Sequence, residues 1–228
     1  MIQLTVAGSS YSVPTSWRDI TYKTYCDIIK FEGSNNDFIA LLSGIPSTTL
    51  QNVDEKSMLM LSELLIFTTD RSFLDRLNYI PENLEQFSIA REEWNKLEKA
   101  KQEIQRHKHY ICAAAGIIKI YFGKDITNEP IYKVWGQINF VLSEINKFFE
   151  KYKRLSEHEE DADEFQANVK RFEQFGFFAQ CVELSRKMGV SYDQVLKMSA
   201  GQVYQTFLYD FEKADYEKAL YKIRSSRK

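Results

Sequence analysis

The sequence predicts a mainly α-helical protein, a helical bundle that begins with a short N-terminal β-hairpin and ends with a C-terminal three-helix unit. Apolar residues recur every three or four positions along most of the chain, which is the period of an amphipathic helix. Strict alternation of apolar and polar residues is confined to the first 13 residues. A length of 228 residues with 44% hydrophobic residues is sufficient for a sizeable core.

The β-hairpin is predicted at the start of the chain. Residues 2–6 and 11–13 alternate apolar and polar side chains, and Gly8, Ser9 and Ser10 supply turn residues between them. An isolated two-stranded hairpin is only marginally stable in water. We therefore expect it to pack against the helices or against another subunit.

Capping and stop residues delimit the helices that follow. These helices are expected after Thr21, at 37–42 before Gly44, after Asp54, at 88 to about 105, and at 110–122 before Gly123. The helix after Asp54 is apolar nearly all round, which predicts a central, well-buried helix. The segment from 88 to 105 is charged and has a thin apolar stripe that includes Trp94, which is typical of a solvated helix.

A further helix is expected to run to about Tyr152, capped by Thr127 or Asn128, with Pro130 in its first turn. The acidic block at 157–164 leads into apolar residues at helical spacing, so we interpret it as the start of a solvated helix; a linker is the alternative. The block divides the chain into two predicted domains. These are 1–155, with the hairpin and the helical body, and 156–228, the C-terminal helical unit; one continuous domain is the alternative.

The C-terminal unit is predicted from the residues that end and begin its helices. Gly189 ends a helix that starts near residue 177, Ser191 caps a short helix, and Ser199 caps the last one. In the last helix an apolar stripe faces inward, and Tyr204 and Tyr216 lie on other faces. Aromatic rings provide large contact areas at interfaces. We therefore expect Tyr204 and Tyr216 to contact a partner protein or neighbouring copies.

Charge and composition exclude several classes of function. Thirty basic and thirty-two acidic residues leave a net charge of -2, which argues against general nucleic-acid binding. The sequence shows neither a signal peptide nor an apolar run long enough to span a membrane. We expect Cys26, Cys112 and Cys181 to be free, buried thiols in a reducing cytoplasm.

Sequence motifs for nucleotide or metal binding are incomplete. Gly116 and Gly123 resemble the glycines of a phosphate loop, but the spacing between them is too long and Asp125 stands where Ser or Thr is needed. His107 and His109 are two residues apart and point away from each other on a helix, so they cannot jointly hold a metal. A catalytic pair of Cys and His from distant parts of the chain stays an alternative.

Two charged segments are also weak candidates. The segment starting at Asp161 begins like a calcium loop, but Gln166 replaces the required Gly and Phe172 replaces the ligating Glu. The basic segment 96–108 contains interleaved glutamates, which favours a solvated helix with ion pairs between its turns over a site for nucleic acid or an acidic protein. We therefore expect no catalytic residue, no metal, no cofactor and no small-molecule substrate.

Two regions resemble the small tail assembly chaperones of tailed bacteriophages. The first is the stretch Pro14-Thr15-Ser16-Trp17-Arg18-Asp19-Ile20-Thr21, which follows the strand pair and leads into a helix. The second is Leu184-Ser185-Arg186-Lys187-Met188-Gly189-Val190-Ser191, with Val195 and Met198-Ser199 after it. The resemblance implies a non-enzymatic morphogenesis protein that holds a tail component such as the tape-measure protein, in the host cytoplasm during assembly.

The chain is longer than many tail chaperones, and the charged helix near Trp94 has no place in their pattern. A structural head–tail connector or tail ring component of the virion is therefore the alternative, with portal or ring proteins and further copies of the chain as partners. An enzyme whose site is assembled from distant residues is a third class. No membrane partner is expected.

Trp17 is expected to fill the base of the helix packing, while Asp19 and Thr21 satisfy the free N–H groups of the following helix. The alternative for Trp17 is an exposed residue that binds a partner. Trp17, Tyr204 and Tyr216 are thus the candidate protein-interaction residues.

Overall fold

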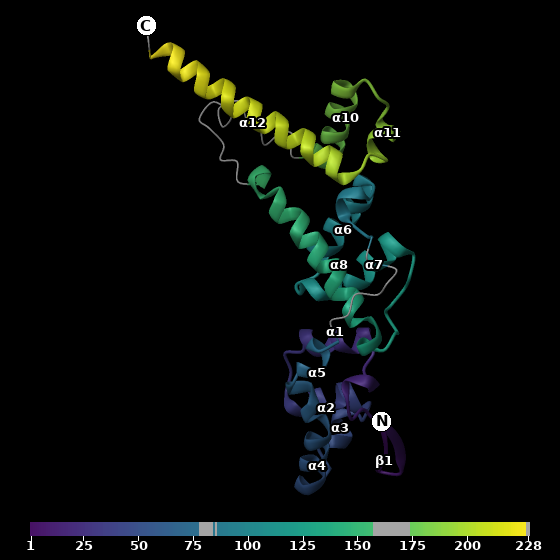
Figure 1. Cartoon of the computed structure of the whole chain (residues 1–228). Helices are drawn as coiled ribbons and strands as arrows, with labels where there is room; N and C mark the ends of the chain where they lie inside the picture. The colour runs from purple at the N-terminus through teal and green to yellow at the C-terminus, as the bar shows by residue number, and fades with distance from the viewer. Residues whose placement is uncertain (78–83, 85, 157–173, 227–228) are drawn as a thin grey trace. The chain divides into compact units, whose positions relative to one another are not determined.

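The computed structural model describes residues 1–77, 84, 86–156 and 174–226. It is mainly α-helical with a two-stranded antiparallel hairpin at the N-terminus, which confirms the predicted fold class (Figure 1). The chain forms two compact units: unit 1 comprises residues 1–85 and 103–142, and unit 2 comprises residues 86–102 and 143–228. The predicted boundary after residue 155 stays a prediction, and the acidic block beside it lies outside the described residues.

In unit 1 the hairpin pairs β1 (Ile2–Val6) with β2 (Ser9–Val13). Ala7 and Gly8 form its turn with φ values of 49° and 78°. Positive φ at both central positions belongs to a two-residue turn whose twist matches that of the strands. The turn predicted at residues 8–10 is therefore wrong in its last two residues, because Ser9 and Ser10 pair within β2.

Local capping sets several helix ends of unit 1, as the sequence predicted. Thr21 and Asp54 each accept a hydrogen bond from the backbone N–H three residues further on. Gly44 and Gly123 end their helices with φ values of 70° and 68°, which glycine adopts at little cost. The elements are η1 (Trp17–Asp19), α1 (Tyr22–Lys30), α2 (Asn35–Ser43), α3 (Ser47–Leu50), α4 (Glu55–Leu65), η2 (Ile66–Thr69), α5 (Ser72–Asp75), η5 (Tyr110–Ala113) and α7 (Ala114–Phe122).

Helix α8 (Ile131–Lys151) contributes its first part to unit 1. Neither Thr127 nor Asn128 is its N-cap, contrary to the sequence prediction. The backbone N–H of Ile131 instead donates to the carbonyl oxygen of Ile20 at 2.8 Å. A neighbouring stretch of chain thus satisfies the N–H that a capping side chain was expected to serve.

Trp17 lies in the core of unit 1, where only 2% of it is exposed. Its indole Nε1 donates to the carbonyl oxygen of Asp70 at 2.7 Å. Its ring meets those of Tyr25 and Phe67 edge to face, with centroid distances of 5.6 and 5.4 Å. Trp17 is therefore a buried core residue and not an exposed contact residue, and its role as an anchor for the hairpin stays a prediction.

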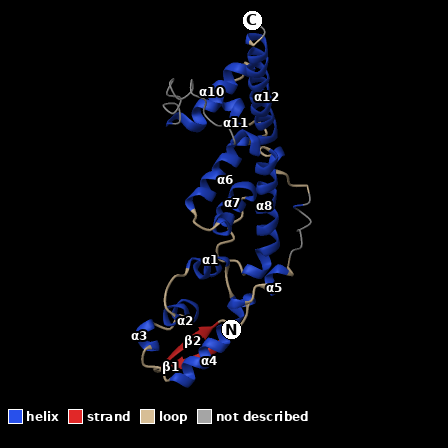
Figure 2. Ribbon diagram, turned by 90° about the vertical axis from the view of Figure 1, so that its left-hand side faces the viewer, coloured by secondary structure: helices blue, strands red, loops and turns tan. Residues whose placement is uncertain are grey.

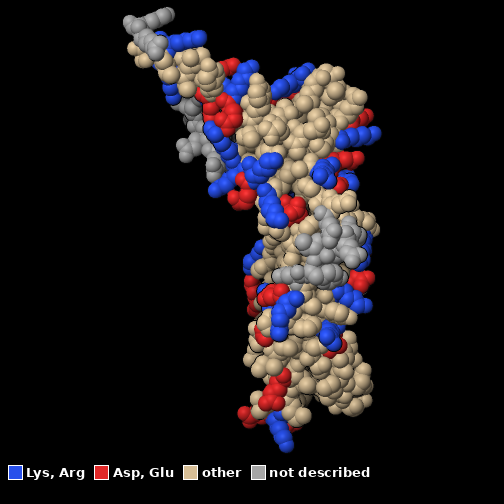
Figure 3. Space-filling view, viewed as in Figure 1, with Lys and Arg blue, Asp and Glu red and all other residues tan. Residues whose placement is uncertain are grey.

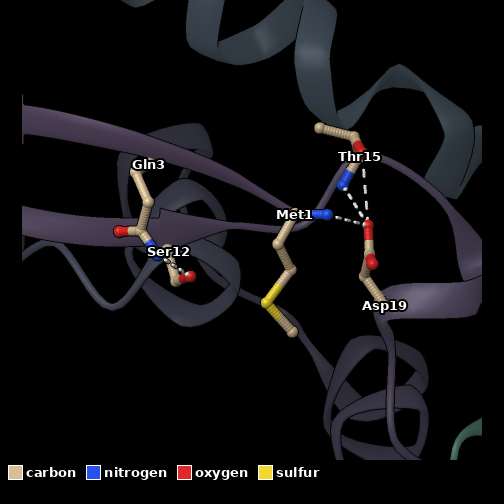
Figure 4. Close-up of polar contacts among 5 residues, drawn as sticks. All are labelled: Met1, Gln3, Ser12, Thr15 and Asp19. Atoms are coloured by element: carbon tan, nitrogen blue, oxygen red, sulfur yellow. Dashed lines mark hydrogen bonds and ion pairs between the residues drawn. The ribbon is translucent and has the colours of Figure 1, made fainter.

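Asp19 does not serve the following helix, contrary to the sequence prediction. Its Oδ2 accepts a hydrogen bond from the backbone N–H of Thr15 at 2.9 Å and pairs with the ammonium group of Met1 at 2.9 Å (Figure 4). Burial acts to raise the pKa of this carboxyl group, but these contacts outweigh burial and hold the pKa below its usual value. Within the hairpin, Gln3 Nε2 donates to Ser12 Oγ at 2.8 Å. Asp19 therefore ties the base of the hairpin to η1.

Helix α4 is only partly buried, so the prediction of a central, well-buried helix is wrong. Leu61 and Leu65 are buried, whereas Leu59 and Met60 are 60% and 57% exposed. Helix α2 contacts α4, and the hairpin lies beside them (Figure 2). The apolar composition of a helix does not determine which of its faces the fold covers.

Unit 2 confirms the predicted caps at Gly189, Ser191 and Ser199. The long charged helix begins at Trp94, later than the predicted residue 88, because a separate helical turn precedes it. The elements are η4 (Ile89–Arg91), the part of α6 (Trp94–Arg106) up to Gln102, the end of α8, η6 (Lys153–Ser156), α10 (Gly176–Met188), α11 (Tyr192–Leu196) and α12 (Ala200–Ser225).

We predict that Trp17→Ala lowers the free energy of unfolding by about 3–5 kcal/mol, because a large buried ring and its hydrogen bond are lost. Trp17→Phe is the matched control; it keeps an aromatic ring and should cost clearly less. Urea denaturation followed by circular dichroism measures both. A loss below about 0.5 kcal/mol for Trp17→Ala, the range of ordinary surface substitutions, would contradict the anchoring role.

Candidate protein-interaction surface

The start of α12 is fixed by the core of unit 2, which is built around Trp94. This side chain is fully buried, and its ring meets those of Phe177 and Phe207 at 4.7 and 5.8 Å between centroids. The backbone N–H of Trp94 donates to the carbonyl oxygen of Met198 at 2.8 Å. These contacts determine which face of α12 is turned inward.

Tyr204 lies on the inward face of α12, not on an outward face as the sequence analysis expected. Its ring packs at 5.0 Å from that of Phe148 and at 5.3 Å from that of Tyr152. Lys101 Nζ donates to its hydroxyl group at 3.2 Å and to Glu98 Oε1 at 2.8 Å. Burial raises the pKa of Tyr204, and the positive charge of Lys101 offsets part of that rise. Tyr204 is therefore an internal residue of unit 2.

Further along α12, Arg154 of η6 contacts the inward face of the helix. Its guanidinium lies 5.6 Å from the ring centroid of Phe211. The same group pairs with Glu212 at 2.6 Å and with Asp215 at 3.4 Å. About half of each of these charged side chains is exposed, so the ion pairs contribute little stability on their own. They extend the packed part of α12 to about residue 215.

A second apolar stripe runs along the opposite face of α12. It consists of Tyr209, Tyr216, Leu220 and Ile223, which we call the outer stripe. Tyr209, Tyr216 and Ile223 are 63%, 65% and 50% exposed. At 3.6 residues per turn the four side chains fall within a sector of about 60° that lies roughly opposite the packed face. Most of the outer stripe thus faces solvent.

The outer stripe begins beside an open groove in unit 2. Tyr209 lines this groove together with Met188 and Met198. Lys187 of α10 lies 5.9 Å from the centroid of the Tyr209 ring and forms an ion pair with Asp210. Methionine side chains adapt to irregular apolar partners. The groove and the stripe together provide an elongated apolar surface with charged margins.

Tyr216 is the one candidate interaction residue from the sequence that lies on this surface. Sequence reasoning missed Tyr209, Leu220 and Ile223 as members of the same stripe. The four residues of the stripe, taken in order, are separated by seven, four and three positions. This helical spacing indicated a second apolar face in the sequence. Which of the two faces is buried depends on contacts that are distant in the sequence.

The candidate chemical motifs have structural roles. Gly123 is a helix C-cap, and a Cβ at Gly116 would meet the side chain of Glu103 at 2.6 Å. The basic segment carries the predicted ion pairs between helical turns, which join Lys101 to Glu98 and Arg106 to Glu103. The calcium-like segment lies outside the described residues.

The three cysteines are free and buried, as expected. Burial raises the pKa of the Cys26 thiol, which disfavours its reactive thiolate form. Within the described residues, no group of three or more His, Cys, Asp and Glu side chains is placed to hold a metal ion. No helix in that part of the chain is both long enough and apolar enough to cross a membrane.

Charged side chains of both signs are interspersed on the face drawn in Figure 3, and no broad basic patch is visible there. No protein-family model, curated protein or solved structure matches the chain.

We predict that substitutions of two tyrosines of α12 change the melting temperature by different amounts. Tyr204→Ser should lower the melting temperature, because it removes a packed ring and leaves Lys101 without its hydroxyl partner. Tyr216→Ser should leave the melting temperature nearly unchanged, because the ring is exposed. Thermal unfolding followed by circular dichroism compares the two variants. Equal shifts for both would show that the assignment of inner and outer faces is incorrect.

Proposed function

We propose that the chain is a non-enzymatic protein that acts through protein–protein contacts. The observation that carries this proposal is the outer stripe of α12, where three large apolar side chains at regular helical spacing are at least half exposed. Contiguous exposed apolar surface on a folded protein is typical of interaction sites. Tyrosine is enriched in such sites because its ring offers contact area at low entropic cost.

The shape of the surface favours a protein partner over a small molecule. Small-molecule sites are concave and bury most of the ligand. The outer stripe instead lies along an exposed helix and spans about 21 Å between Tyr209 and Ile223, at 1.5 Å per residue. An elongated helical face of this kind is suited to another helix, which inserts its own apolar residues along it.

Within this class, we propose a role in bacteriophage morphogenesis, similar to that of tail assembly chaperones. The sequence resemblance around Trp17 and from Leu184 to Ser199 supports this role. The chain would hold an aggregation-prone tail component, such as the tape-measure protein, in the host cytoplasm. A connector or tail ring protein is the second candidate, because an exposed stripe also serves contacts between copies in a closed ring.

The test uses the full chain with an affinity tag, expressed from the phage genome during infection. A chaperone should co-purify with a tail protein from infected cells and should be absent from purified virions by mass spectrometry. A connector should be present in virions at a fixed copy number. The double variant Tyr209→Ser/Tyr216→Ser should reduce co-purification of the phage protein about tenfold or more. Tyr221→Ser is the matched control, because Tyr221 is also exposed but lies outside the stripe.

Two outcomes would overturn the proposal. If no phage protein co-purifies and the chain is absent from virions, the role in morphogenesis is refuted. If the double variant binds the phage protein as well as the parent chain does, the outer stripe is not the contact surface.

A further inference from the structure

A second exposed apolar surface lies in unit 1, between α2 and α4. The groove there is lined by Phe38, Leu59, Leu65 and Ile66, among other residues. Leu59 and Ile66 are 60% and 66% exposed. We call this surface the α4 groove. It is the surface that the sequence analysis expected to be covered by the rest of the protein.

The α4 groove and the outer stripe match in spacing. Leu59 and Ile66 are seven residues apart, as are Tyr216 and Ile223. Seven residues rise about 10 Å along a helix, so the two pairs of side chains have nearly the same separation. Two helices with matching pairs of this kind can pack side by side along their exposed faces.

The two surfaces also have opposite charges at their margins. Helix α4 with its N-cap, residues 54–65, has three acidic residues, Asp54, Glu55 and Glu63, and one basic residue, Lys56. Glu63 lines the groove itself. The end of α12 from 218 to 225 has three basic residues and no acidic residue. Attraction between unlike charges favours the encounter of the two surfaces and fixes their orientation.

We propose that the α4 groove of one chain receives the outer stripe of a second copy, with the two helices antiparallel. Ile223 then lies beside Leu59, and Tyr216 lies beside Ile66. In this direction the basic end of α12 runs toward Asp54 and Glu55 at the start of α4. The negative end of the α12 helix dipole also meets the positive end of the α4 dipole. The opposite direction loses both of these attractions.

The contact joins two different surfaces, so it is heterologous. A pair of chains joined in this way keeps one free groove, on one chain, and one free stripe, on the other. Further copies therefore add until a ring closes or a filament forms. The inference rests on the proposed function, because it names a second copy as a partner of the outer stripe.

The test mixes two variants of the full chain. Leu59→Glu/Ile66→Glu removes the groove and keeps the stripe, and Tyr216→Glu/Ile223→Glu removes the stripe and keeps the groove. Sedimentation velocity over a concentration series should show oligomers for the parent chain and about tenfold or more weaker association for each variant alone. An equimolar mixture should form a one-to-one dimer and nothing larger, because each pair retains a single productive contact.

Matched controls separate this contact from general effects of charge. Leu41→Glu on α2 and Tyr221→Glu on α12 also place a charge on an exposed apolar residue, but neither residue belongs to the groove or the stripe. Leu41→Glu should associate like the parent chain. Tyr221→Glu, which subtracts one charge from the basic end of α12, should weaken association far less than Tyr216→Glu/Ile223→Glu does. Circular dichroism verifies folding, and Leu59→Ser/Ile66→Ser replaces the groove variant if the glutamates disturb unit 1. Raising the salt concentration should weaken association of the parent chain.

Three results would overturn the inference. The first is a parent chain that stays monomeric at every concentration. The second is a groove variant that associates as strongly as the parent chain, which would mean that the stripe pairs elsewhere. The third is weakening by Tyr221→Glu equal to that by Tyr216→Glu/Ile223→Glu. If the groove variant self-associates normally while the stripe variant loses a phage partner, the inference fails and the proposed function stands.

Discussion

The buried indole of Trp94 determines what unit 2 presents to solvent. Its contacts with Phe177 and Phe207 hold the inner face of α12, and its backbone N–H bonds to the carbonyl oxygen of Met198, just before α12 begins. Gly201 adds to this constraint, because a Cβ there would lie 2.8 Å from the carbonyl oxygen of Ala90. Because its start is fixed in this way, α12 adopts a single orientation about its own axis. The outer stripe faces outward as a direct consequence.

A helix with two opposite apolar stripes can bury only one of them inside its own unit. When a partner covers exposed apolar surface, the free energy of association becomes more favourable by about 25 cal/mol for each Å² that is buried. The residues of the outer stripe, and Leu59 and Ile66 in the α4 groove, therefore gain free energy when another chain covers them. This gain favours association, while the packed cores of the two units do not depend on it. Folding and binding thus use different residues of the same helices.

The sequence was sufficient for features that depend on neighbouring residues. The caps at Thr21, Ser191 and Ser199 were predictable because each side chain bonds to a backbone N–H three residues away. The two errors with most consequence concern Tyr204 and α4. The side of α12 that carries Tyr204 is chosen by Phe148 and Lys101, far away in the sequence, and the exposure of α4 depends on what the rest of unit 1 leaves uncovered. The outer stripe was visible as a periodic pattern, but its exposure was not.

The most direct test of the account is a photo-crosslink from the outer stripe. Benzoylphenylalanine in place of Tyr216, in a mixture of isotopically light and heavy full chains, reports what covers the stripe in solution. Crosslinks between light and heavy chains should join position 216 to residues 59–69, near Ile66. The same group in place of Tyr204 should give crosslinks only within one chain. Equal crosslinking between chains from both positions, or none from position 216, would contradict the account.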